Sequence, residues 1–108
     1  MRSHQDIDAR TLAMHRVIAE KIRRDPALIE RARLTLARWL STVDPASRPY
    51  LDQWQHLLSQ DLETCLAAVV EESPRATALR QSSPFAGLLT HAERFALLKS
   101  TRPDHEAR

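Results

Sequence analysis

The chain is short of glycine and of cysteine, and each shortage excludes classes of function. Its 108 residues contain one glycine, whereas a phosphate-binding loop needs several so that backbone N–H groups can approach the phosphate. One glycine also argues against a β-rich fold, whose tight hairpins use glycine at positive φ. The single cysteine, Cys65, excludes an intrachain disulfide and a cysteine-ligated zinc site.

Long apolar runs are missing as well. No run reaches the roughly 18 residues that a membrane span needs, and the polar start, Met1–Arg10, lacks the apolar core of a signal peptide. We therefore expect a cytoplasmic protein that does not contact a membrane. The 43% hydrophobic and 28% charged residues suit one globular domain, which we place at residues 1–100 with a frayed tail at 101–108.

Apolar spacing and proline punctuation predict an all-α fold, a compact bundle of five or six short helices. Asp25-Pro26 and Ser73-Pro74 each combine a capping residue with a proline suited to a first helical position, and Ser47 is a further candidate cap. Thr90 and Glu93 have the spacing of a capping box. The predicted helices are Gln5–Arg24, Asp25–Ser41, Arg48–Leu58, Asp61–Glu71, Ser73–Gln81 and His91–Lys99.

The stripes on these helices predict what is buried. We expect Trp39 and Trp54 in one core, and Phe95 and Leu98 on the buried face of the last helix. His15 and His56 lie beside apolar stripes and are interpreted as partly buried structural histidines. Cys65 falls within an apolar stretch and is interpreted as a small buried hydrophobic residue rather than a catalytic thiol.

No arrangement of residues indicates catalysis. The five histidines are scattered, and no two have the i, i+4 spacing that places two metal ligands on one helix face. No Ser-His-Asp or Cys-His pattern is recognisable. We therefore expect a protein that is not an enzyme and has neither metal nor cofactor.

Charge is distributed unevenly along the chain. Residues 21–43 carry a net charge of +4, residues 44–72 carry −5 and residues 73–108 carry +3. This segregation either steers a charged partner or reflects solvated helix faces. Because the second helix is basic and follows a turn, DNA binding is one hypothesis, with Arg31, Thr35 and Arg38 reaching phosphates or base edges.

The segment Arg80–Leu89 is the least like a simple connection between helices. It combines an aromatic residue, the one glycine and a backbone restricted before Pro84. It either tucks Phe85 and Leu88 into the core or presents Phe85 as an anchor for a partner.

Two segments resemble a known family. Arg80–Lys99, RQSSPFAGLLTHAERFALLK, and His15–Trp39, HRVIAEKIRRDPALIERARLTLARW, are similar to small bacterial antitoxin-like proteins. The resemblance is greatest to the chaperone-like antitoxins that are paired with zeta-toxin-like effectors of polynucleotide-kinase fold. It implies a helical, non-catalytic protein that binds the toxin encoded by a neighbouring gene and masks its active site.

For such a partner we expect a contact surface around the Arg80–Phe85 segment. Arg80 and Arg94 would pair with carboxylates of the toxin, Ser82 lies within the same surface, and Phe85 would be the anchor. The competing hypothesis uses the outer face of the first helix, with Arg10 and Arg16. Operator DNA remains a possible second partner.

Overall fold

The computed structural model describes residues 4–100 of the chain, and this part is built of helices joined by short turns. The helices are α1 (His4–Arg24), α2 (Ile29–Leu40), α3 (Arg48–Leu58), α4 (Leu62–Val69), α5 (Pro74–Arg80) and α6 (His91–Ser100), with two 3₁₀ turns, η1 (Pro26–Leu28) and η2 (Ala86–Leu88). No strand occurs within residues 4–100, so the prediction of an all-α bundle with five or six helices is confirmed.

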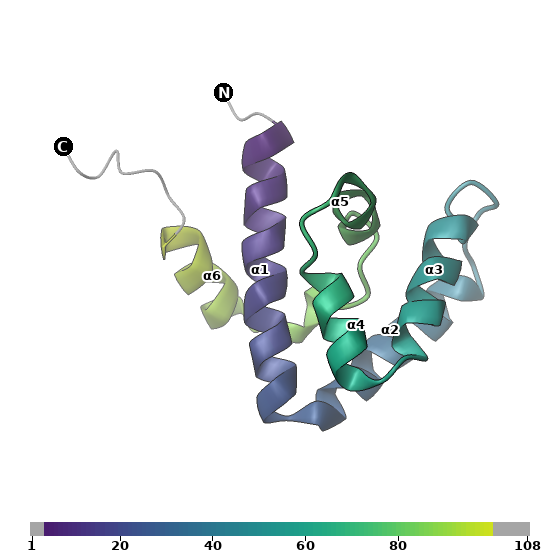
Figure 1. The fold of residues 1–108 in the computed structure, drawn as a ribbon, viewed down its shortest axis with the longest axis horizontal. Helices are drawn as coiled ribbons and strands as arrows, with labels where there is room; N and C mark the ends of the chain where they lie inside the picture. Colours follow the sequence, from purple (N-terminus) through teal and green to yellow (C-terminus); the bar gives the residue numbers. More distant parts are fainter. Residues whose placement is uncertain (1–3, 101–108) are drawn as a thin grey trace.

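The central element is α1, which packs against α4, α5, α6 and both 3₁₀ turns. In Figure 1, α6 lies on one side of α1, and α4 and α5 lie on the other. Beyond them α2 and α3 pack against each other as a helical hairpin. This arrangement follows from sequence, because α1 has 21 residues and is the one helix long enough to span the other layers.

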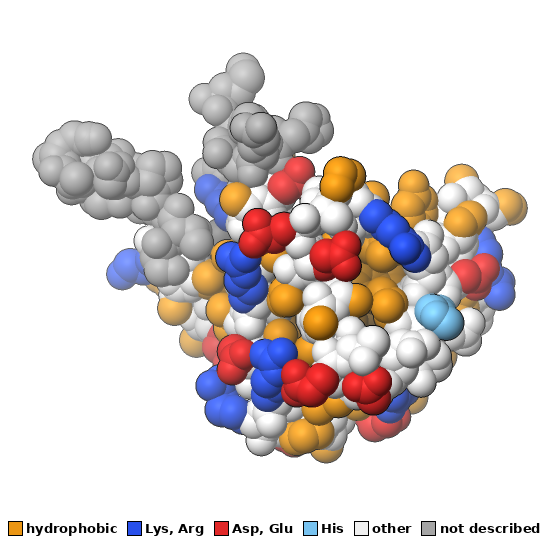
Figure 2. All heavy atoms as spheres, viewed as in Figure 1, with side chains coloured by type: hydrophobic (Ala, Val, Ile, Leu, Met, Phe, Trp, Pro, Cys, Tyr) orange, Lys and Arg blue, Asp and Glu red, His pale blue; other side chains and the backbone are white. Residues whose placement is uncertain are grey.

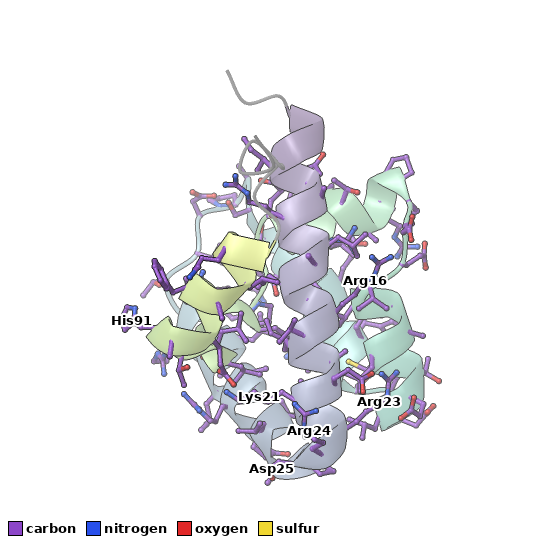
Figure 3. All side chains as sticks on the ribbon, turned by 90° about the vertical axis from the view of Figure 1, so that its left-hand side faces the viewer. Arg16, Lys21, Arg23, Arg24, Asp25 and His91 are labelled. Carbon is purple, nitrogen blue, oxygen red and sulfur yellow. The ribbon has the colours of Figure 1, made fainter. Side chains whose placement is uncertain are left out.

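Ion pairs hold α1 to the helices on both of its sides. Lys21 Nζ lies 2.7 Å from Glu93 Oε1 at the start of α6, and Arg23 Nη2 lies 3.2 Å from Glu63 Oε1 on α4. Figure 3 shows Lys21 on the side of α1 that faces α6, and Arg23 on the opposite side. Over α1 and α4, basic and acidic side chains alternate on the face seen in Figure 2.

One hydrophobic core joins the helices from α1 to α5 with the segment that follows α5. Trp54 lies at its centre, 1% exposed, and its indole N–H donates to the Leu79 carbonyl at 2.8 Å. The ring of Phe85 meets Trp54 edge to face, with ring centroids 5.5 Å apart. Other fully buried members of the core are Ile18, Ile22, Leu66 and Val69.

Three helix starts have side-chain caps. The Asp61 carboxylate accepts from the Thr64 N–H, and the Ser73 hydroxyl accepts from the Ala76 N–H, each at 3.1 Å. The predicted capping box is confirmed, since the Thr90 hydroxyl accepts from the Glu93 N–H at 3.1 Å and Glu93 accepts from the Thr90 N–H at 2.8 Å. These caps set where α4, α5 and α6 begin.

Two of the expected caps are wrong. Neither Asp25 nor Ser47 makes a side-chain capping bond. After Asp25 the chain first forms η1, which begins with Pro26. At the start of α3 the Asp44 carboxylate accepts from the Ser47 N–H instead, at 2.9 Å.

The predicted burial of three side chains is also wrong. Trp39 is 37% exposed, because α2 turns Ala32 and Leu36 toward the core and leaves Trp39 on the flank. Phe95 is 66% exposed, since α6 packs against α1 on one side and Phe95 lies on another side of the helix. His56 is exposed as well. The Leu98 side chain and the predicted tail at 101–108 lie outside the described residues.

Two phenylalanines with opposite environments test this packing. We expect Phe85→Ala to lower the free energy of unfolding by about 3–5 kcal/mol, since it removes a fully buried ring that packs on Trp54. We expect Phe95→Ala to change it by less than about 0.5 kcal/mol, because that ring lies mostly in solvent. Urea denaturation followed by circular dichroism measures both, and equal losses would contradict the packing described.

Candidate functional site

The segment expected to form the contact surface is largely interior. Phe85 is 0% exposed, so the expectation that it is an exposed anchor is wrong, and the alternative, in which the loop tucks Phe85 and Leu88 into the core, is confirmed. The reason is the contact with Trp54, a residue 31 positions away in sequence, which fills the space beside the ring. Ser82 is half-buried, next to the buried pair Ser83 and Pro84.

Arg80 is buried too, and its guanidinium donates hydrogen bonds to carbonyls at the end of α4. It is 6% exposed, and its Nη1 donates to the carbonyls of Val69 and Glu71, each at 2.9 Å. These carbonyls belong to the last turn of α4 and the residues after it, where a cation is favourable. Burial lowers the pKa of Arg80, which nevertheless remains a cation at neutral pH. The expectation that Arg80 is free on the surface is therefore wrong.

His15 and Ser83 form a contact that the sequence analysis missed. They are 68 residues apart, yet His15 Nε2 lies 2.7 Å from Ser83 Oγ. His15 Nδ1 lies 2.8 Å from the Thr11 carbonyl, which only accepts, so Nδ1 carries the proton and Nε2 accepts from the Ser83 hydroxyl. Ser83 Oγ in turn accepts from the Phe85 N–H at 3.1 Å. This chain of hydrogen bonds fixes the loop onto α1.

A serine within hydrogen-bond distance of a histidine is also how hydrolases activate a nucleophile. Here both side chains are buried, so a substrate has no access to the hydroxyl. Burial lowers the pKa of His15, opposed by its hydrogen bond to Thr11 and reinforced by the nearby charge of Arg80. The pair therefore holds structure together, and its neutral imidazole is part of that structure.

Cys65 belongs to the core, as the sequence predicts. Burial raises the pKa of its thiol to about 11, so the thiol stays protonated at neutral pH. Among the described residues, no group of three His, Cys, Asp or Glu side chains is placed to hold a metal ion. Within residues 4–100 no helix has the length and apolar character needed to cross a membrane.

The remaining arginines of the expected surface do not lie together. Arg94 is half-buried and donates to the Ala86 carbonyl at 3.0 Å, so it fixes α6 to the turn η2. Arg16 is exposed but pairs with Glu72, with Nη2 2.6 Å from Oε2. Arg10 lies six positions before Arg16, which places the two roughly 120° apart around the axis of α1. Arg10 and Arg16 therefore do not form one patch.

The outer face of α2 is different, because two of its arginines have no side-chain partner among the described residues. Arg31, Leu34 and Arg38 follow i, i+3, i+7 spacing and lie opposite the core-facing residues Ala32 and Leu36. Leu34 is 63% exposed. Within residues 4–100 neither arginine makes an ion pair or a side-chain hydrogen bond. We call these three residues the α2 stripe; Thr35, half-buried, borders it.

Comparison with protein families, with curated proteins and with solved structures finds no match to this chain. The resemblance to antitoxins therefore stays a prediction. The α2 stripe combines an exposed leucine with two arginines that make no ion pair within residues 4–100.

The His15 contact makes stability depend on pH in a defined window. Because the folded-state pKa lies below the ordinary value near 6.5, the unfolded chain binds a proton more readily than the folded chain below pH 6.5. We expect full stability above that pH and a loss of up to about 1.4 kcal/mol per pH unit as the pH falls from 6.5 to the folded-state pKa.

Urea denaturation between pH 7.5 and pH 5 measures this slope. His15→Gln should flatten it, whereas His56→Gln, which changes an exposed histidine, should leave it in place. A wild-type slope that survives His15→Gln would show that another group causes the dependence.

Proposed function

We propose that this chain is a non-catalytic binding protein of the antitoxin type, which holds a partner protein and masks its active site. The observation that supports this proposal best is the α2 stripe, an exposed leucine between two arginines that have no acidic partner within the described residues. The proposal moves the contact surface from the Arg80–Phe85 segment, which is interior, to α2.

The chemistry of the stripe favours a partner with an acidic, partly apolar surface. An arginine pairs with a carboxylate through two parallel hydrogen bonds, and such pairs strengthen when the partner excludes water. Leu34 adds apolar area at the centre, where interface residues contribute most to affinity. A toxin whose active site binds a nucleotide with magnesium would offer carboxylates of this kind.

Operator DNA is the second candidate, and the same helix supports it. Arg31, Thr35 and Arg38 lie along one side of α2 and would contact phosphates or base edges. Leu34 distinguishes the two candidates, because a leucine adds nothing to the electrostatic attraction of phosphates, whereas its removal from water against an apolar surface is favourable. A protein partner buries it favourably.

Two variants separate these functions. With the product of the neighbouring gene as the ligand in calorimetry, we expect Leu34→Ser to weaken binding by about 2 kcal/mol, or roughly 30-fold. The double change Arg31→Glu with Arg38→Glu should weaken it further, because it places charges of like sign on both sides of the interface. Since all three side chains point outward, the thermal melts should match the wild type.

Phe95→Ser and Arg75→Glu are the matched controls, since they change an exposed apolar residue and an exposed arginine on other helices. Full toxin binding by Leu34→Ser would contradict the proposal. Loss of operator binding in the double arginine variant, with Leu34→Ser unaffected and a steep dependence on salt, would instead support the DNA function.

A further inference from the structure

A groove runs along the α2–α3 hairpin, beside the α2 stripe. It has a volume of about 250 Å³, and its apolar lining residues are Leu36, Ala37, Leu40 and Leu58. An apolar cavity of roughly 150 Å³ accommodates a benzene ring, so this groove has room for a large apolar side chain of a partner. In Figure 1 the α3 side of the hairpin lies at the opposite end of the molecule from α6.

The polar groups of the groove are mostly engaged within the chain. Arg33 lines it, and this arginine donates from Nη2 to the Leu58 carbonyl at 2.8 Å and pairs through Nη1 with Glu30. The Ser59 hydroxyl donates to a carbonyl in the last turn of α3 at 2.6 Å. The remaining polar side chain of the lining is Gln55.

This scarcity of polar partners favours a helix over an extended peptide as the occupant. An extended peptide brings a backbone N–H and a carbonyl with almost every residue, and most of these groups would be buried in the groove without a partner. A helix satisfies the same groups within itself and presents side chains only.

The length of the groove also suits a helix. On α2 its lining extends from Arg33 to Leu40, which spans about 10.5 Å along the axis, or two turns. Apolar side chains at i, i+4 and i+7 of a partner helix cover the same distance. Such a helix would pack between α2 and α3, with its row of apolar side chains in the groove.

The charges beside the groove are unbalanced. Arg38 directly follows Ala37 of the lining, and neither Arg38 nor the second arginine of the α2 stripe makes an ion pair within residues 4–100. The carboxylates that α2 and α3 carry, Glu30 and Asp52, each pair with an arginine of the same helix. The hairpin therefore presents unpaired positive charge beside an apolar groove, which is complementary to an acidic amphipathic helix.

We propose that the α2–α3 groove binds an acidic amphipathic helix of the partner protein, whose apolar side chains enter the groove and whose flanking carboxylates pair with Arg31 and Arg38. Leu34 would contact the edge of the same apolar face, because it lies one helix turn from Ala37 and Arg38. This inference rests on the proposed function, since the α2 stripe forms one side of the surface, and it adds the structural element that the partner supplies.

Designed peptides test the groove without the partner protein. The probe is a capped peptide of about 18 residues of alanine, leucine and glutamate, long enough to form a helix, with leucine at i, i+4 and i+7 and glutamate on both flanks. Its control has the same composition with the leucines spread around the helix. In a ¹H–¹⁵N titration of the full chain, we expect the probe to shift the amides of Ala37, Leu40, Gln55 and Ser59. The control should bind at least roughly tenfold more weakly, because it has no apolar face.

A substitution that fills the groove tests the location. Ala37→Trp should abolish the shifts at Gln55 and Ser59, whereas Ala67→Trp, at an exposed position of α4 that does not line the groove, should leave them in place. Both alanines are exposed, so the thermal melts of the two variants should match that of the wild type.

The charge complementarity is tested separately. A third peptide, with lysine in place of each glutamate, should bind at least roughly tenfold more weakly than the probe. Arg38→Gln should weaken binding of the glutamate probe about threefold at low salt and much less at high salt. Arg75→Gln, which changes an exposed arginine of α5, is the matched control and should have no such effect.

Equal binding of the probe and either control peptide, or binding to the Ala37→Trp variant as strong as to the wild type, would overturn the proposal. So would a bound probe whose circular dichroism shows no gain of helix. These outcomes leave the proposed function intact, since that function is read from toxin binding by Leu34→Ser. Full toxin binding by Leu34→Ser contradicts the proposed function whatever the peptides do.

Discussion

The contact between Phe85 and Trp54 is the interaction on which the rest of this structure depends. It joins the segment after α5 to the middle of α3, and the Ser83–His15 hydrogen bond ties the same segment to α1. Three parts of the chain that are far apart in sequence are thereby held at one point. Because α6 follows this segment directly, its position along α1 is set by the same contact, together with the Lys21–Glu93 ion pair.

This constraint decides which basic residues are available to a partner. Arg80 donates to the Val69 carbonyl and Arg94 donates to the Ala86 carbonyl, and Arg16 forms an ion pair with Glu72. Their charges stabilise helix ends and helix contacts, so the surface expected around Phe85 does not exist as an arginine patch. The α2 stripe lies on the side of α2 opposite Ala32 and Leu36, which face the core, and its two arginines make no ion pair within residues 4–100.

The helices and most of their ends could be predicted from sequence, because they depend on local rules. The third helix was predicted at Arg48–Leu58, where the structure has it, and the Thr90–Glu93 box fixed the start of the last. The site could not be predicted in this way. Whether Phe85 faces in or out depends on Trp54, and whether Ser83 has a base beside it depends on His15, both brought there by tertiary packing. Trp39 and Phe95 show the same limit, since an apolar residue on the edge of a stripe is buried only if a neighbouring helix covers it.

The uneven charge of the sequence gains a physical meaning once the ion pairs are placed. Residues 21–43 carry the excess of positive charge, and the structure neutralises half of their basic residues: Lys21 with Glu93, Arg23 with Glu20 and Glu63, and Arg33 with Glu30. Arg24, Arg31 and Arg38 have no such partner within residues 4–100. Two acidic residues of 44–72, Glu63 and Glu72, pair with Arg23 and Arg16 of α1, and the basic residues without such a partner lie at the end of α1 and along α2. A partner attracted by the net charge of this segment would therefore meet α2 first, where Leu34 stands between the two free arginines.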